Sequence, residues 1–472
     1  MIEQTGKDKQ KMAVILGAGF LLRLFYVMFS TIYDRQYDIG TIDLDAGDIV
    51  SGGHLAYIQY LYENWHLPDF NPTTVYQFNH PPFHHYICAV WMKFCSLFIS
   101  DTAILEESIQ MVPFVCSLLT LLVLQKVVRQ LVTEEKTQRF LMLLFAFHPA
   151  LVLLAGSVNN DCMSLLFTLL CVYTAIEWGR KPTTGNIVKI ALSIALGMLT
   201  KQNVAEMAFP IAIVFLYVWY RESKLHGGFG KLFRQFLVFG LISIPLGMSF
   251  YLHNMIRHGM PLIWVYELAE DSWQYTGNVP VLNRFLWPIP AEMVDNLKNF
   301  RLGCGYNVWM QIIRTSVLGE WDMANVGRLV KILAVLLMLN GAALAAAALA
   351  AFIYVFLIHR KKFMAAELTA DKDINAARTN AASTPRIDWP VWIMFIVGYA
   401  VNMLFYLKFA YDYPQQCSMH FRYIEITLLF PAAALGIVWQ KSRYKWMRRV
   451  LVLLLMGFCV LSAAMIGVWC LG

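Results

Sequence analysis

Long apolar stretches recur along the whole chain, separated by short basic segments and by two long polar segments rich in aromatic residues. A membrane-spanning helix needs about 20 mainly apolar residues, because its length must match a hydrocarbon core roughly 30 Å thick. Eleven segments meet this criterion: about 12–31, 107–128, 139–156, 161–178, 186–200, 203–220, 236–253, 329–358, 389–409, 423–440 and 449–470. The pattern therefore predicts an all-α polytopic membrane protein.

The composition supports this fold class. The chain has 472 residues, of which 58% are hydrophobic and only 15% are charged. A soluble protein is about a quarter charged. The excess of apolar side chains excludes a soluble enzyme, a disordered chain and a nucleic-acid-binding module.

The positions of the basic residues predict the orientation in the membrane. Cytoplasmic loops carry an excess of Lys and Arg. Most of the 38 basic residues fall in six short segments, 1–11, 126–139, 180–189, 221–235, 359–388 and 441–449. This places the N-terminus in the cytoplasm, and the net charge of +7 then records topology rather than a nucleic-acid partner. The first span lacks a signal-peptide cleavage site and is expected to be retained.

The same pattern divides the chain into two predicted modules. Residues 1–235 form a catalytic-type membrane module with a first outer loop at 32–106. Residues 236–472 form a second module, with a lid-like outer loop at 254–328 and an inner linker at 359–388.

The nine cysteines form no CxxC pair, so the sequence predicts neither a zinc site nor a disulfide framework. Cys304 and Cys417 both fall on the predicted outer side. They form either a disulfide or two free thiols.

Acidic residues are concentrated directly after the first span. Asp34, Asp38, Asp43, Asp45 and Asp48 lie within fifteen residues of one another. A carboxylate held at the bilayer surface can act as a general base that deprotonates a nucleophile. The alternative is a solvated loop, and the pattern leaves both interpretations open.

A second motif lies further along the first outer loop. His80 precedes Pro81 and Pro82, and a proline pair is typical of the start of a helix. Backbone N–H groups at a helix start, together with an imidazole, suit a phosphate. A simple helix start with interfacial aromatic residues explains the motif equally well.

A third polar motif, Asn159-Asn160-Asp161, lies between two strongly apolar runs. A carboxylate at that depth is costly and is usually functional. The same residues also suit a polar turn that caps the next helix. Both interpretations can hold together.

Two isolated cations complete the candidate set. Lys201 lies at the outer end of the fifth predicted span, and Arg422 lies at the outer start of the tenth. Each calls for an anionic partner such as a lipid phosphate, although snorkelling to headgroups is the alternative. Arg23, inside the first span, is expected to pair with a carboxylate from another helix.

The order of these motifs resembles the GT-C glycosyltransferases, specifically the family 39-like group of protein O-mannosyltransferases and aminoarabinose lipid A transferases. The matching features are Asp38, His80-Pro81-Pro82-Phe83, Asn160-Asp161 and Leu199-Thr200-Lys201. The resemblance covers residues 12–220 best. Beyond them it rests on the run from Arg314 to Glu320 and on Phe421-Arg422-Tyr423. Similar runs in Gram-positive bacteria suggest a bacterial plasma membrane.

The resemblance implies a GT-C fold and an inverting transfer of sugar on the outer face. The donor would be a polyprenyl- or dolichyl-phosphate sugar, and the acceptor a lipid, glycan or protein. Asp38 would be the general base, and Asp161 would orient the acceptor or hold a divalent metal ion, if one is used. His80, Lys201 and Arg422 would neutralise the leaving phosphate, where charge builds up in the transition state.

This sequence departs from the family pattern in two places. The relatives have Asp-Glu just before the helix that follows the first loop Asp, whereas this helix is expected to begin at Gly52-Gly53-His54. The base could therefore be Asp45 or Asp48. An acidic-basic pair ahead of the prolines is replaced by Asn79-His80, which argues against a metal site and against aminoarabinose as the sugar.

A polytopic transporter or lipid flippase is the main rival. It predicts charges near the bilayer midplane and broken helices in symmetric halves. The sequence instead has acids at one surface and no evident internal repeat, which favours the enzyme. A scaffold subunit without catalysis remains a third option.

Overall fold

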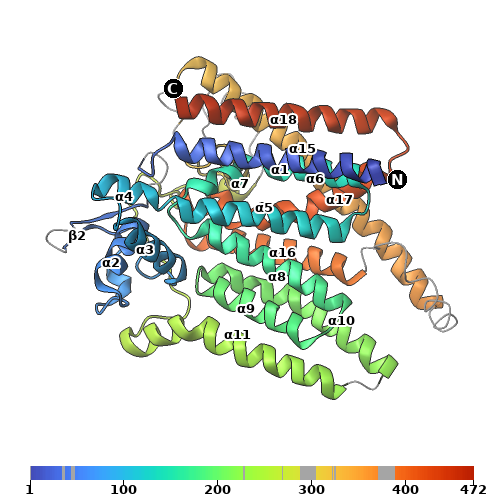
Figure 1. Ribbon diagram of the computed structural model, residues 1–472, viewed down its shortest axis with the longest axis horizontal. Helices are drawn as coiled ribbons and strands as arrows, with labels where there is room; N and C mark the ends of the chain where they lie inside the picture. The colour runs from blue at the N-terminus through green and yellow to red at the C-terminus, as the bar shows by residue number, and fades with distance from the viewer. Residues whose placement is uncertain are drawn as a thin grey trace.

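Helices dominate the protein, whose computed structural model is shown in Figure 1. The structure describes residues 2–33, 38–43, 48–226, 229–267, 269–286, 305–321, 323, 326–369 and 389–471. Asp34 and Asp45 lie outside these ranges, as do Cys304 and residues 370–388 of the predicted linker. The pairing of Cys304 with Cys417 therefore stays a prediction.

From the N-terminus to residue 258 the helices follow one another, most of them with short connections after α3 (Phe83–Cys95). The chain begins with α1 (Ile2–Met28). Next come β1 (Thr41–Asp43), β2 (Asp48–Ser51), α2 (His54–Asn64), η1 (Pro72–Thr74), α3 (Phe83–Cys95) and α4 (Thr102–Ser108). Then follow α5 (Met111–Leu131), α6 (Glu135–Phe147), α7 (Pro149–Leu153), η2 (Leu154–Gly156), α8 (Asp161–Arg180), α9 (Thr184–Met198), η3 (Gln202–Met207), α10 (Ala208–His226) and α11 (Phe229–His258).

The rest of the chain contains α15 (Arg328–Thr369), the longest of the helices that the structure describes. Its elements are α12 (Val281–Phe285), α14 (Val308–Leu318), α15 (Arg328–Thr369), α16 (Trp389–Asp412), η5 (Cys417–Met419), η6 (Phe421–Tyr423), η7 (Glu425–Leu428), α17 (Leu429–Lys441) and α18 (Lys445–Leu471). The strands β1 and β2 pair as an antiparallel hairpin and are the only sheet in the part of the chain described. The all-α fold class is confirmed.

Eight helices in the described ranges are long and apolar enough to cross a membrane, or nine if one bent pair counts as a span. They are Asp8–Met28, Thr102–Leu131, Asp161–Arg180, Gln202–Ser223, Leu232–His258, Arg328–Ile358, Pro390–Asp412 and Lys445–Leu471. The predicted count of eleven is not confirmed, because three predicted spans are short or broken. The segment 139–156 is bent by 57°, 186–200 corresponds to the 15-residue α9, and 423–440 starts in 3-10 turns before α17.

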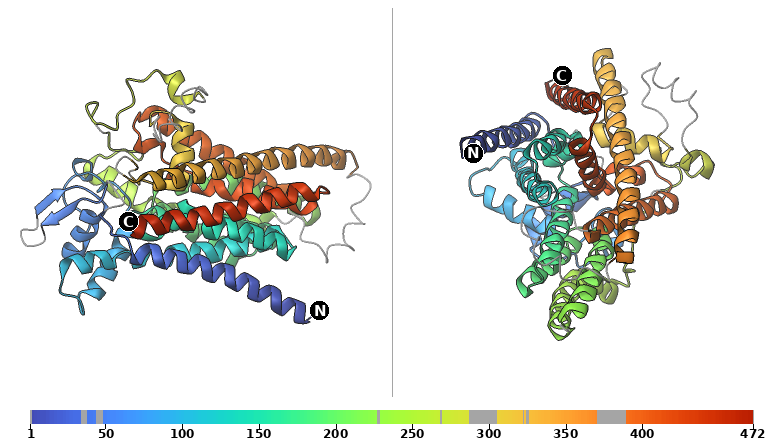
Figure 2. Two further views of the ribbon diagram at one scale, coloured as in Figure 1. Left: turned by 90° about the horizontal axis from the view of Figure 1, so that it is seen from above. Right: turned by 90° about the vertical axis from the view of Figure 1, so that its right-hand side faces the viewer.

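The helices pack side by side, with α8 at the centre of the first module between α5, α9 and α10 (Figures 1 and 2). α11 covers α9, and α15 packs on α17 and α18. α8 is largely buried, whereas α11 and α15 expose much of their apolar surface. A helix that is apolar on all sides suits the interior of a membrane protein, and apolar surface exposed on outer helices suits lipid.

The break between α6 and α7 corrects the prediction for Arg23. Pro149 cannot continue a helix, so α6 ends at Phe147 and leaves carbonyl groups without helical partners. The Arg23 guanidinium donates to the carbonyls of Ala146 (2.8 Å) and Phe145 (3.5 Å), and to Ser117 Oγ (2.9 Å). Arg23 therefore pairs with backbone carbonyls, and the expected carboxylate partner was wrong.

The two long polar segments meet at one end of the helices. The hairpin, α2, α3 and α4 lie at the end opposite the N-terminus (Figure 1). Arg257 Nη2, at the end of α11, lies 2.9 Å from Asp69 Oδ1, and the rings of Tyr76 and Tyr266 are in contact. The segments predicted to share one side thus do so. Which side faces the cytoplasm remains a prediction.

Candidate active site

Asp38 is held in place by the start of α2. The backbone carbonyl of Asp38 accepts a hydrogen bond from the His54 amide at 2.8 Å, and the Ile39 carbonyl accepts one from Leu55 at 2.7 Å. A Cβ atom on Gly53 would lie 2.1 Å from the Ile39 backbone, so only glycine permits this approach. The glycine that departs from the family pattern therefore has a structural reason, and the predicted helix start at this point is confirmed.

The Asp38 side chain is buried and shares one oxygen between two partners. Its Oδ2 atom lies 3.5 Å from Arg422 Nη1 and 3.6 Å from His54 Nε2. Its Oδ1 atom has no hydrogen-bond partner among the residues described. Burial would raise the pKa of Asp38, but Arg422 and His54 outweigh burial and hold this pKa well below its usual range. Asp38 is thus ionised with one oxygen available.

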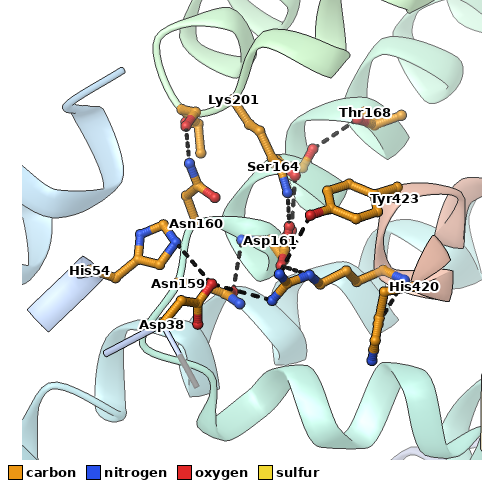
Figure 3. Close-up of polar contacts among 12 residues, drawn as sticks. Asp38, His54, Asn159, Asn160, Asp161, Ser164, Thr168, Lys201, His420 and Tyr423 are labelled. Atoms are coloured by element: carbon orange, nitrogen blue, oxygen red, sulfur yellow. Dashed lines mark hydrogen bonds and ion pairs between the residues drawn. The ribbon is translucent and has the colours of Figure 1, made fainter. Parts of the chain in front are cut away.

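Asp161 lies at the first position of α8, as the sequence predicts. Its amide donates to Asn159 Oδ1 at 3.1 Å. Its side chain is 2% exposed and forms a close ion pair with Lys201 through Oδ1, as Figure 3 shows. The Oδ2 atom lies 3.8 Å from Arg422 Nε. Both oxygens of Asp161 are therefore engaged by cations.

Arg422 joins the two carboxylates from the opposite half of the chain. It lies in η6, where its amide donates to His420 Nδ1 at 3.4 Å. Its Nη1 atom also lies 2.9 Å from Glu320 Oε1, which makes Glu320 its closest carboxylate partner. Glu320 follows α14, and the sequence placed it only at the end of a family-like run, without a role. An acid in an outer segment was the signal that could have identified it.

The turn formed by Leu199 and Thr200 connects the start of α3 with the Asn159-Asn160-Asp161 motif. The Leu199 carbonyl accepts a hydrogen bond from the amide of Phe83, at the start of α3, at 2.9 Å. The Thr200 carbonyl accepts one from Asn160 Nδ2 at 2.8 Å (Figure 3). Three motifs that are far apart in the sequence are thus linked through one turn, and Lys201 follows directly.

His80 lies beside this centre but offers no charge. Its ring stacks on His54 with centroids 5.2 Å apart. Burial, together with the charges near His54 and Lys201, holds the pKa of His80 well below its usual range. His80 is therefore neutral at neutral pH and can contribute a hydrogen bond. Because Leu199 occupies the Phe83 amide, the start of α3 is also less open to a phosphate than its sequence suggests.

A cavity of about 50 Å³ lies beside Arg422. Its lining combines charged, polar and apolar side chains. The lining includes Tyr26, Leu153, Asp161, Glu320, Trp321 and Arg422. This combination suits a ligand with an anionic head and an apolar body.

The acidic side chains that the structure describes do not fit a divalent metal ion. Within the described ranges, no group of three or more His, Cys, Asp or Glu side chains could hold one. Asp38 and Asp161 are already paired with Arg422 and Lys201, whose positive charges oppose a metal ion between them. The chemistry below therefore uses only the side chains of the protein.

The structure describes one of the two alternative bases in part and the other not at all. Asp48 starts β2, where only its backbone is described, and Asp45 lies outside the described residues. The choice among Asp38, Asp45 and Asp48 therefore remains a prediction, to which the geometry adds support only for Asp38.

Residues 79–244 match the family described as dolichyl-phosphate-mannose-protein mannosyltransferase. This range contains His80, Asp161 and Lys201, and it lacks Asp38 and Arg422. No match was found among the curated proteins.

Solved structures share the fold. The oligosaccharyltransferase of Archaeoglobus fulgidus, in complex with zinc and sulfate, is 13% identical with a TM-score of 0.51 over 96% of this chain and 53% of that chain. ArnT from Cupriavidus metallidurans bound to undecaprenyl phosphate is 16% identical, with a TM-score of 0.37 over 92% of this chain and 77% of that chain. This chain spans about half the length of the oligosaccharyltransferase. The likeness to the oligosaccharyltransferase shows a shared fold, in agreement with the GT-C fold that the motifs suggested.

Proposed function

We propose that this protein is an inverting glycosyltransferase that transfers a sugar from a polyprenyl- or dolichyl-phosphate donor to an acceptor hydroxyl. The observation that carries the proposal is the convergence of Asp38, Asp161 and Glu320 on Arg422, with Lys201 on Asp161. The GT-C fold and the matching mannosyltransferase family support it. The proposal also puts this centre on the outer face of a bacterial plasma membrane, with the N-terminus in the cytoplasm. The excess of Lys and Arg in the six short segments supports this orientation.

Asp38 is the general base in this reaction. Its Oδ1 atom, which has no partner, takes the proton of the acceptor hydroxyl while Oδ2 stays with Arg422 and His54. The acceptor oxygen then bonds to the anomeric carbon, and the bond from that carbon to the phosphate oxygen breaks. The bonding pair leaves with the lipid phosphate. A single displacement inverts the anomeric configuration.

Lys201 and Arg422 stabilise the charge that develops on the leaving phosphate. Arg422 offers a planar fork that can bind two phosphate oxygens, and Lys201 offers a point charge. Both are already paired with carboxylates, so the donor must replace Glu320 or Asp161 as the partner of Arg422. Asp161 then orients Lys201 and the acceptor, and His80 donates a hydrogen bond.

Transport of a lipid-linked sugar is the rival function. Asp38 contacts His54 at the start of α2, and α2 and α3 lie at one end of the helices (Figure 1). The fold is shared with an oligosaccharyltransferase. A transporter needs its binding site near the midplane, so both observations favour the enzyme.

The decisive experiment uses the purified protein in detergent with synthetic polyprenyl-phosphate mannose and polyprenyl-phosphate glucose. We expect release of polyprenyl phosphate from one donor when a glycan, peptide or lipid acceptor is present. Asp38→Asn should abolish release while the protein stays monodisperse, and Asp48→Asn serves as the matched control. Activity in Asp38→Asn but not in Asp48→Asn would move the base to Asp48. No release by the wild type with any acceptor would contradict the enzyme.

A further inference from the structure

Histidine side chains gather on the side of Asp38 that faces away from the two cations. His54 begins α2, while His80 precedes α3, and His84 and His85 lie in its first turn. His54 and His85 are 3% and 0% exposed. Their rings lie nearly parallel, with centroids 5.2 Å apart. In the mechanism above, His54 only contacts Asp38 and His80 only donates a hydrogen bond, while His84 and His85 have no role.

The cluster forms a continuous path from the proposed base. Asp38 Oδ2 lies 3.6 Å from His54 Nε2, and His54 Nδ1 lies 2.9 Å from His85 Nε2. A hydrogen bond at Nδ1 decides which ring nitrogen of a histidine carries its proton. With His85 accepting from Nδ1–H, the Nε2 atom of His54 keeps a free lone pair toward Asp38.

Among the described residues, charged groups lie at the Asp38 end of the path. Arg422 faces Asp38, and Lys201 lies near His80, which stacks on His54. Around His85 lie the Tyr57 ring at 4.6 Å and the His84 ring at 5.5 Å. His84 donates to the Val158 carbonyl at 2.9 Å, and burial lowers its pKa to about 4. The inner part of the path is therefore made of neutral groups.

Asp38 needs such a path because it holds a proton poorly. Despite burial, Arg422 keeps the pKa of Asp38 well below its usual range. A base with such a low pKa can accept the proton of the acceptor hydroxyl but releases it readily. A second acceptor within reach removes that difficulty.

We propose that His54 is a proton relay for Asp38, and that His85 is a positioning residue that fixes the tautomer of His54. The proposal rests on the proposed function. The acceptor O–H bond breaks as the new bond to the anomeric carbon forms, and the proton passes to Asp38 Oδ1. A half-turn about the Cβ–Cγ bond of Asp38 brings this proton to His54 Nε2. The products are an imidazolium beside a carboxylate, and a lipid phosphate that has left with the bonding pair.

The test measures release of polyprenyl phosphate between pH 5 and 9. Glutamine at position 54 keeps a polar side chain beside Asp38 but cannot take a proton. We therefore expect His54→Gln to lower kcat by about 10²-fold and to remove the acidic limb of its pH profile, with KM for the donor unchanged. His66→Gln is the matched control, because the His66 side chain is 52% exposed in the same outer loop.

A second variant tests the positioning residue. His85→Gln should keep the acidic limb but shift it, because the Nδ1 partner of His54 changes. If His54→Gln does not give a monodisperse protein, this shift decides the matter, and an unchanged limb overturns the relay. Wild-type rates and pH profile in His54→Gln, with Asp38→Asn inactive, overturn the relay and leave the enzyme intact. A wild type that releases no polyprenyl phosphate contradicts the proposed function itself.

Discussion

Asp38 and Asp161 are both buried aspartates that contact the same guanidinium, yet their surroundings differ. Asp38 lies 3.5 Å and Asp161 lies 3.8 Å from Arg422. Asp38 follows a loop, has a histidine as its second partner and keeps one oxygen without a partner in the described structure. Asp161 begins a membrane helix and has Lys201 on its other oxygen.

The comparison teaches that the partners of a carboxylate, rather than its depth, decide what it can do. Two acids in one site take different roles when their environments differ. Asp38 has a free lone pair and can move a proton. Asp161 has both oxygens engaged by cations, so it serves as a counter-charge that holds Lys201 and Arg422 in position.

The largest effect is expected from Asp161→Asn. Removal of one partner from a buried ion pair leaves the other charge without compensation and costs about 3–5 kcal/mol. We expect a lower midpoint of thermal unfolding in detergent, together with loss of sugar transfer. Asp38→Asn should abolish transfer with a much smaller change in this midpoint, because Arg422 keeps Asp161 and Glu320.

A double variant is the control for this prediction. Asp161→Asn with Lys201→Met removes both charges and should recover much of the thermal stability without recovering activity. Equal destabilisation by the single and the double variant would show that Lys201 does not depend on Asp161.

Arg422→Lys tests the group that the two acids share. Lysine keeps the positive charge. Its single ammonium group cannot contact Asp38, Asp161 and Glu320 together, as the planar guanidinium does. We expect the transfer rate to fall by about 10²-fold, since about 3 kcal/mol of charge-assisted hydrogen bonding is lost in the transition state. Steady-state kinetics with the donor measure this effect. A rate within twofold of the wild type would contradict the central role of Arg422.

The stability of the folded protein should depend on pH through buried His84. Burial lowers the pKa of His84 to about 4, whereas this pKa is about 6.5 in the unfolded chain. The unfolded state therefore binds more protons between these values, and stability that is complete above pH 6.5 is lost as the pH falls toward 4. The loss is on the order of 3 kcal/mol. Thermal unfolding from pH 7 to 4 should show it, and His84→Gln should show a flatter dependence. Equal slopes would exclude His84 as the cause.

The smallest effect is expected from Glu320→Gln. Glu320 is the nearest carboxylate to Arg422, at 2.9 Å, and competes with the donor phosphate for it. Its neutral variant should bind polyprenyl phosphate several-fold more tightly, as partly exposed ion pairs contribute about 1 kcal/mol. Binding can be followed by thermal shift against lipid concentration. Weaker binding would show that Glu320 supports the site instead of competing for it.

The sequence predicted the fold class and several element starts, because these depend on local patterns. Apolar length indicated the membrane helices, and α2, α3 and α8 begin where glycine, proline and asparagine predicted. The number of spans was not predictable in this way. The bend at Pro149 and the 3-10 turns before α17 divide apolar runs that composition alone treats as continuous.

The contacts between distant segments could not be predicted from the sequence. The motifs indicated Asp38, Asp161, Lys201 and Arg422 as candidates. They did not indicate that one guanidinium contacts three carboxylates. The turn at Leu199 and Thr200 acts through its backbone carbonyls, which leave no trace in residue type. His54 entered the sequence argument only as a helix start, since its contacts with Asp38 and His85 depend on how α2 packs against α3.

The contact of Arg23 with the end of α6 has a consequence for biosynthesis. The carbonyls of Phe145 and Ala146 would meet hydrocarbon without a donor, at a cost of several kcal/mol each. α1 precedes α6 in the chain, so the guanidinium reaches the bilayer before the helix that needs it. The donor that the broken helix needs is therefore already present in the chain when α6 is synthesised.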